Sequence, residues 1–275
     1  MISILIEMFS FTFFARAIVV GLLVSLCASL LGVNLVLKRY AMIGSGLSHV
    51  GFVAMVLAMT LEFAHFPVTL PIVVLAAFLL LRLNENSKIN GDSAVALIST
   101  SSLAIGFIIV TQTTGYTASV CMVMFGSILA MTRADLHLSI GLSIAVLTLF
   151  VLFYKQLFAV TYDETFAKAT GTKVGVYKSL LALLTALTVV LGMRMMGAML
   201  ITGLTVFPAL SAMRLCKRFL SVVITSAAVA VVCFFVGMVI SYVHNLPPGA
   251  SVIAVNLAIF ILFSGATLVK QGGRA

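Results

Sequence analysis

The chain has 275 residues, 63% of them hydrophobic and only 8% charged, and its formal net charge is +9. Because soluble domains carry about 25% charged residues, this composition excludes a soluble globular protein and indicates an integral membrane protein. The apolar runs show no alternation with a period of two residues, which favours helices over a membrane β-barrel. We therefore predict an all-α polytopic membrane protein in which residues 1–275 form a single transmembrane domain.

The apolar segments predict eight or nine crossings, since a helix needs roughly 20 residues to cross a hydrocarbon core about 30 Å thick. If the first segment crosses the membrane, the chain has nine crossings and its amino terminus lies outside. If that segment lies partly in the interface, the chain has eight crossings and its amino terminus lies inside. That end carries Glu7 and no basic stretch before its apolar part, so we expect it to be retained and not cleaved as a signal peptide. The nine segments are residues 13–37, 46–61, 66–82, 92–112, 135–154, 174–192, 196–213, 219–242 and 250–269.

The basic residues divide unequally between the two sides of the membrane. When the connections alternate, only Arg16, Arg133 and Arg194 fall on one side, and every other Lys and Arg falls on the opposite side. Cytoplasmic loops are enriched in Lys and Arg, so the larger group marks the cytoplasmic side. Membrane topology therefore explains the positive charge without a nucleic-acid partner.

The stretch from Lys38 to Val50 reads KRYAMIGSGLSHV and contains His49, the only histidine inside an apolar run. A polar side chain within a membrane-spanning segment is a functional candidate by default, because protein groups must solvate it there. A structural hydrogen bond near the start of a helix is the alternative role for His49.

Two stretches do not fit simple crossings. Residues 113–134 lie between two crossings on the outer side, yet their second half is apolar. Irregular backbone at membrane depth is tolerated where it lines a cavity, so we predict a re-entrant or gating segment there, with a lipid-surface helix as the alternative.

In the segment 196–213, Gly203 and Pro208 predict a broken helix of the kind that lines transport sites, because proline removes a helix hydrogen bond. Packing alone is the alternative explanation for its glycines.

Residues 161–171, TYDETFAKATG, form the longest polar stretch between apolar runs. Thr161 and Glu164 have the spacing of a capping box, which predicts a short cytoplasmic helix with Thr161 as its N-cap. Gly171 is suited to end this helix in the left-handed conformation. The helix either joins two spans or docks a cytoplasmic partner, with Tyr162 and Phe166 as apolar anchors.

The remaining polar residues argue against coupled carriers and enzymes. All Asp and Glu residues lie near segment ends or in loops, whereas proton- and sodium-coupled carriers use carboxylates at mid-membrane. No GxxxxGK[ST] loop is present to bind ATP, so ATP hydrolysis would have to occur in another chain. Ser48 loosely resembles a protease nucleophile, but the other histidines map to outer edges and no HExxH motif is present. We therefore expect a transport subunit and not an enzyme.

Five blocks of sequence resemble, in the same order, the membrane permease of ABC importers for zinc and manganese. They are LGVNLVLKRYAMIGSGLSHVGF at 31–52, DSAVALISTSSLAIGFII at 92–109, MFGSILAMTRADL at 124–136, YDETFAKATGTKV at 162–174 and MGAMLITGLTVFPALSAM at 196–213.

The resemblance implies a multi-pass subunit in the cytoplasmic membrane of a prokaryote, in contact with lipid. It implies that the polar helix, at 162–170, is a coupling helix seated in a cytoplasmic ABC ATPase subunit. It further implies that a homodimer of the permease forms the pore and that an external metal-binding protein delivers the substrate. The implied coupling residues are Tyr162, Asp163, Glu164, Phe166, Ala167, Lys168 and Gly171.

The family usually has an aspartate one helical turn before the histidine, at the position where this chain has Ser45. Zinc accepts imidazole readily, while manganese prefers oxygen ligands and above all carboxylates. We therefore expect zinc as the transported substrate and no permanently bound cofactor. A manganese or iron importer, or a metal carrier not coupled to ATP, is the alternative. The candidate metal ligands are His49 and Ser45, and the candidate pore-lining or gating residues are Gly44, Gly46, Ser48, Gly203 and Pro208.

Overall fold

The computed structural model describes residues 12–63, 65–86, 91–112 and 133–272, and this part of the chain is helical almost throughout. Nine of its helices are long and apolar enough to cross a membrane. The predicted all-α polytopic fold is therefore confirmed. The segment predicted to be re-entrant, residues 113–134, falls almost entirely outside the described residues.

The long helices begin and end close to the predicted apolar segments, because in hydrocarbon a helix is the local structure that pairs its own backbone groups. They are α2 (Thr12–Leu37), α3 (Ile43–Thr60), α4 (His65–Asn86), α5 (Gly91–Gln112), α7 (Arg133–Leu152), α10 (Val174–Met196), α11 (Ala198–Leu215), α12 (Phe219–His244) and α13 (Pro248–Gly272). Two shorter helices, α8 (Tyr154–Tyr162) and α9 (Glu164–Ala169), connect α7 to α10.

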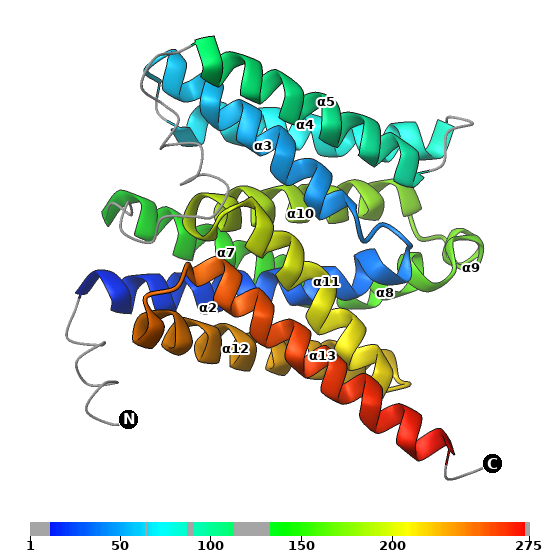
Figure 1. Cartoon of the computed structure of the whole chain (residues 1–275). Helices are drawn as coiled ribbons and strands as arrows, with labels where there is room; N and C mark the ends of the chain where they lie inside the picture. Colours follow the sequence, from blue (N-terminus) through cyan, green and yellow to red (C-terminus); the bar gives the residue numbers. More distant parts are fainter. Residues whose placement is uncertain (1–11, 64, 87–90, 113–132, 273–275) are drawn as a thin grey trace.

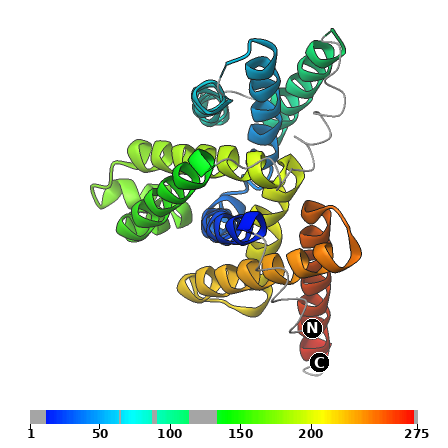
Figure 2. The same cartoon turned by 90° about the vertical axis from the view of Figure 1, so that its left-hand side faces the viewer.

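Helix α2 is the centre of the bundle. Within its most apolar window 78% of the residues are buried inside the chain, against 22% to 56% for the other spans. In Figure 2 α2 is seen end-on in the middle, with α10, α11 and α12 around it. Figure 1 shows α3, α4 and α5 gathered on one side of this core and α12 and α13 on the other.

Glycines allow α2 and its neighbours to approach closely. A Cβ added to Gly32 of α2 would lie 1.9 Å from the backbone oxygen of Thr205 in α11. One added to Gly237 of α12 would lie 2.5 Å from Cα of Val252 in α13. Lipid tails are as apolar as leucine, so close contact through small residues, and not the hydrophobic effect, holds membrane helices together.

Charged side chains mark opposite ends of the bundle. At one end, Glu164 of α9 pairs with Lys38 at the end of α2 and with Lys178 of α10. At the other end, Nη1 of Arg194 in α10 lies 2.6 Å from Oδ1 of Asp135 in α7. The prediction that Lys38 and Lys178 lie at the opposite end of the bundle from Arg194 is confirmed. We refer to the end that carries α9, at the right of Figure 1, as the predicted cytoplasmic end.

Helix α11 departs from the prediction of a broken helix. It continues through Pro208 from Ala198 to Leu215. A membrane helix tolerates proline when neighbouring groups compensate for the lost hydrogen bond, so the predicted break is wrong. The chain instead turns at Gly197, between α10 and α11, where φ is 84° and ψ is 161°. L side chains rarely adopt this conformation, and glycine adopts it without strain.

Replacement of Gly32 by alanine should destabilise the protein, because a methyl group at this position collides with the Thr205 carbonyl and forces α2 away from α11. Overpacking of this kind costs about 1–3 kcal/mol. Thermal unfolding in detergent should therefore show a lower midpoint for Gly32→Ala. Gly141→Ala in α7 is the matched control, since no atom lies within 4 Å of an added Cβ there. Equal midpoints for the two variants would contradict the close contact.

Candidate transport cavity and coupling corner

A cavity of about 400 Å³ opens between α3, α11 and α13. Ser45 and His49 line it from α3, where a spacing of one helical turn places them on the same face. Thr202 and Gly203 line it from α11. The described lining residues are Met42, Ser45, His49, Ala198, Met199, Thr202, Gly203, Val206, Phe207 and Ile253, and none of them is acidic.

The ring of His49 is half-buried and is held by α5, which does not line the cavity. Its Nδ1 lies at hydrogen-bonding distance from Oγ of Ser99 in α5. A hydrogen bond to one ring nitrogen fixes the orientation of the imidazole and determines what the other nitrogen offers to a ligand. Ser99 therefore belongs to the site, although the sequence analysis did not identify it. The only available signal was a polar run, residues 99–102, in an otherwise apolar segment.

The structure brings three of the predicted site residues together, Ser45, His49 and Gly203. The others lie elsewhere. Ser48 is 1% exposed and donates a 2.8 Å hydrogen bond to the Ser45 carbonyl. The two glycines face neighbouring helices, since a Cβ on Gly44 would lie 3.3 Å from Oγ1 of Thr205 and one on Gly46 would lie 2.9 Å from Val95.

Pro208 is buried within α11 and does not line the cavity either. The other described lining residues were missing from the prediction, namely Met42, Ala198, Met199, Thr202, Val206, Phe207 and Ile253. The pore-lining and gating roles of all these residues stay predictions.

A single copy of the chain offers few metal ligands at the cavity. Among the described residues, no group of three or more His, Cys, Asp and Glu side chains is placed to hold a metal ion. His49 contributes one imidazole, and Ser45 and Thr202 contribute hydroxyl groups. Metal sites in proteins generally have four or more ligands, so the remaining ligands of a bound ion would have to come from water or a second copy.

The corner where α8 (Tyr154–Tyr162) meets α9 (Glu164–Ala169) does not contain the predicted capping box. Asp163, and not Thr161, is the N-cap of α9, because its Oδ1 accepts hydrogen bonds from the backbone N–H groups of Thr165 (2.9 Å) and Phe166 (3.0 Å). The backbone of Asp163 is extended and separates α8 from α9, so Thr161 remains inside α8. An aspartate directly before the first helical residue is as good an N-cap as threonine and is closer to the free amides.

The predicted end of the short helix is confirmed. Gly171 has φ 79°, in the left-handed region. The N–H groups of Gly171 and Thr172 donate to the carbonyls of Lys168 and Ala167, both at 3.0 Å. These two bonds are the Schellman pattern, in which a glycine satisfies the last carbonyls of a helix.

The residues of this corner face in two directions. Tyr162 and Phe166 are 80% and 63% exposed. Glu164 instead lies between Nζ of Lys38 at 3.0 Å and Nζ of Lys178 at 2.7 Å. Partial burial acts to raise the pKa of the Glu164 carboxyl, but the hydrogen bonds and positive charges of Lys178 and Lys38 outweigh it and lower the pKa below its ordinary value. The carboxylate is therefore ionised at neutral pH.

In the described part of the chain, eight apolar helices around the central span α2, an open cavity between three of them and a short capped helix at one end define a polytopic membrane permease. The sequence pattern of the ABC 3 transport family matches residues 10–266, and the chain therefore belongs to that family. The predicted kinship with the permeases of metal ABC importers is confirmed.

The chain is similar along most of its length to proteins with named transport roles. It is 27% identical over 256 residues to the manganese transport system membrane protein MntC of Halalkalibacterium halodurans, covering 93% of this chain and 88% of that protein. It is 27% identical over 247 residues to the high-affinity zinc uptake system membrane protein ZnuB of Haemophilus influenzae, covering 90% and 94%. Its fold matches a chain in the solved structure of PsaBC from Streptococcus pneumoniae in complex with Fab, with a TM-score of 0.85, 27% identity and coverage of 96% and 95%.

Cysteine labelling tests which side chains face the cavity. In a background without the native cysteines, Ser45→Cys should react readily with a hydrophilic thiol reagent, because residue 45 lines the cavity. Ser48→Cys should react at least about tenfold more slowly, since a buried thiol has to wait for local opening and 1.4 kcal/mol of opening free energy corresponds to a factor of ten. Similar rates for both cysteines would contradict the placement of α3.

Proposed function

We propose that the chain forms, as a homodimer, the transmembrane pore of an ATP-driven importer that moves a divalent transition metal into the cytoplasm, with zinc as the preferred substrate. The observation that carries the proposal is the cavity in which Ser45 and His49 share one wall with no acidic residue among the described lining. Membership of the ABC 3 transport family supports the ATP-driven mechanism.

The partners follow from the two ends of the molecule. A cytoplasmic ABC ATPase subunit would bind the corner of α8 and α9, where Tyr162 and Phe166 are exposed. An external metal-binding protein would deliver the ion at the opposite end, in the cytoplasmic membrane of a prokaryote. ATP binding and hydrolysis in the partner would then switch the cavity between outward and inward access.

The ligand chemistry favours zinc. Two copies would contribute two imidazoles and the hydroxyls of Ser45 and Thr202, whereas manganese binds most strongly to carboxylates. Manganese is the second candidate, because relatives such as MntC of Halalkalibacterium halodurans are named for manganese transport. Competition among zinc, manganese and iron in uptake assays distinguishes these substrates.

His49→Ala should abolish zinc uptake in proteoliposomes that contain the permease, its ATPase and its binding protein, because it removes the imidazole from the cavity wall. Assembly with the ATPase should remain intact. His244→Ala is the matched control, since His244 is exposed at the end of α12, outside the cavity. Unchanged uptake by His49→Ala would show that His49 has a structural role and is not a ligand. Uptake by the wild-type protein without ATP would point to a carrier or channel and would contradict the importer.

Ser45→Asp should keep transport active and raise manganese uptake relative to zinc uptake severalfold, because each copy then adds a carboxylate next to His49. The measurement is uptake of the two metals in competition, in cells that carry the full transporter. Ser45→Asn is the control for side-chain size without charge. A metal preference that stays the same in Ser45→Asp would show that residue 45 is not a ligand.

A further inference from the structure

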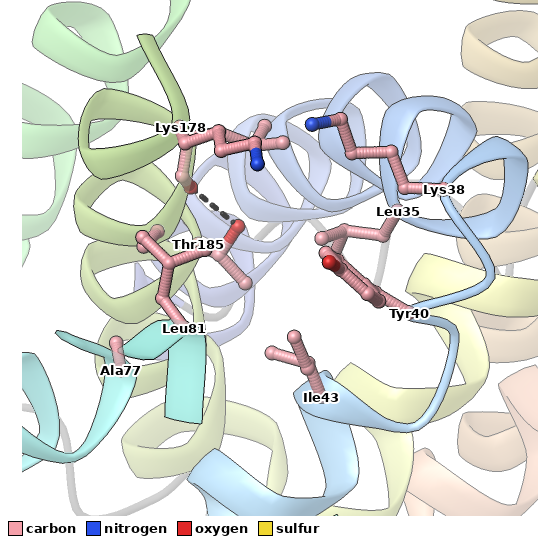
Figure 3. A pocket seen from close by; sticks show the side chains of 10 residues that line it. Leu35, Lys38, Tyr40, Ile43, Ala77, Leu81, Lys178 and Thr185 are labelled. Carbon is pink, nitrogen blue, oxygen red and sulfur yellow. Dashed lines mark hydrogen bonds between the residues drawn. The ribbon is translucent and has the colours of Figure 1, made fainter. Parts of the chain in front are cut away.

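Two lysines with largely buried side chains, at the predicted cytoplasmic end, share one carboxylate. The side chains of Lys38 and Lys178 are 6% and 11% exposed, and both pair with Glu164 of α9. Figure 3 shows the two lysine side chains extending toward each other, one from the residue after α2 and one from α10, beside a small recess that Tyr40 and Thr185 also line. Buried ammonium groups require a hydrogen-bonded counter-charge, so Glu164 is bound into the helix bundle.

A second polar contact joins the neighbouring helix α8 to α2. Asn34 lies one turn before Lys38 on α2 and is fully buried. Its Oδ1 accepts a 2.9 Å hydrogen bond from Oγ1 of Thr161 in α8. Apolar contacts contribute little at α9, because Ala167 is its only buried residue. Leu157 and Val160 of α8 add apolar packing, and polar side chains hold the corner to successive turns of α2.

The connection from α2 to α3 is stiff. Arg39 adopts φ 60°, and the N–H groups of Arg39 and Tyr40 donate to the carbonyls of Val36 (3.0 Å) and Leu35 (2.8 Å). The N–H of Ile43 then donates to the Tyr40 carbonyl at 3.0 Å, where α3 begins. Hydrogen bonds thus fix the start of α3 relative to the end of α2.

Both walls of the cavity are connected to this corner. Ser45 and His49 lie in the first two turns of α3, directly after the stiff connection. Lys178 lies near the start of α10, which leads through Gly197 into α11, the opposite wall. A displacement of α9 therefore has two covalent routes to the cavity, a short one from Lys38 into α3 and a longer one from Lys178 along α10 into α11. Each route begins at a lysine bound to Glu164.

We propose that Glu164 is a transmission residue: it passes movement of α9 through Lys38 to α3 and through Lys178 to α10 and α11. The inference rests on the proposed function and deepens it, because Glu164 acts on helices of its own chain and not on the ATPase surface. Tyr162 and Phe166 make the outward contact, while Glu164 makes the inward one.

The first experiment uses Glu164→Gln in the complete importer, reconstituted in proteoliposomes with the ATPase and the binding protein. Co-purification of the ATPase should be unchanged and ATP hydrolysis should persist, while the amount of metal moved per ATP should fall about tenfold, within the usual range of coupling between sites. Asp92→Asn is the matched control, since it removes one carboxylate charge at an exposed position in the first turn of α5, away from α8 and α9. It should retain the wild-type ratio.

The double variant Lys38→Met with Glu164→Gln should be no worse than Glu164→Gln alone, because residues that act through one contact are not additive. Loss of ATPase association in Glu164→Gln would assign this residue to docking and overturn the inference. An unchanged ratio of metal to ATP would overturn it as well.

The second experiment does not depend on the metal. The reactivity of Ser45→Cys is measured in the permease and ATPase complex, with and without nucleotide trapped by vanadate. Trapping should change this reactivity in the otherwise wild-type chain and should not change it when Glu164→Gln is added. An equal change in both backgrounds would overturn the inference. The transporter could also move neither zinc nor manganese while Glu164→Gln abolishes the change in Ser45→Cys reactivity. That result would contradict the proposed substrate and would still support the inference.

Discussion

Thr205 of α11 lies against glycines of two other helices, and the cavity depends on this contact. Its carbonyl meets Gly32 of the central helix α2, and its hydroxyl meets Gly44 of α3. In hydrocarbon such close contacts replace the hydrophobic effect as the force between helices. The spacing of α3 from α11 is therefore set at Thr205, and one turn away these two helices separate to form the walls that carry His49 and Thr202.

Polar side chains of the described bundle form hydrogen bonds in two distinct ways. Threonines such as Thr185 and Thr188 donate to carbonyls of their own helix, at 2.7 and 2.9 Å, and these bonds require no neighbour. His49 is bound across helices by Ser99, and Glu164 is bound across helices by two lysines. Bonds of the second kind hold separate helices in register, and they occur at the cavity and at the corner of α8 and α9.

The two faces of the corner differ. Tyr162 and Phe166 present exposed rings, whereas Glu164 and Ala167 face the bundle. Its ends are closed by its own residues, with Asp163 as the N-cap and Gly171 as the left-handed terminator. A partner is therefore not needed to form this short helix. A force applied to its outer face would reach α2 and α10 through polar contacts and would not be absorbed by unwinding.

The sequence by itself determined the helical membrane fold, the opposite ends marked by Lys38 and Arg194, the end of α9 at Gly171 and the kinship with metal importer permeases. The kinship rests on the resemblance of five ordered sequence blocks, and the other features follow from composition, charge and short-range spacing. The shared face of Ser45 and His49 follows from the helix period alone. Only the tertiary structure decided that Gly203 joins them, that Ser99 holds His49, and that Gly44, Gly46 and Ser48 face other helices. It also decided that Asp163 caps α9 and leaves Glu164 to bind Lys38 and Lys178. The physical reason is that these contacts join helices far apart in the chain, and the packing that brings them together is not encoded in any local pattern.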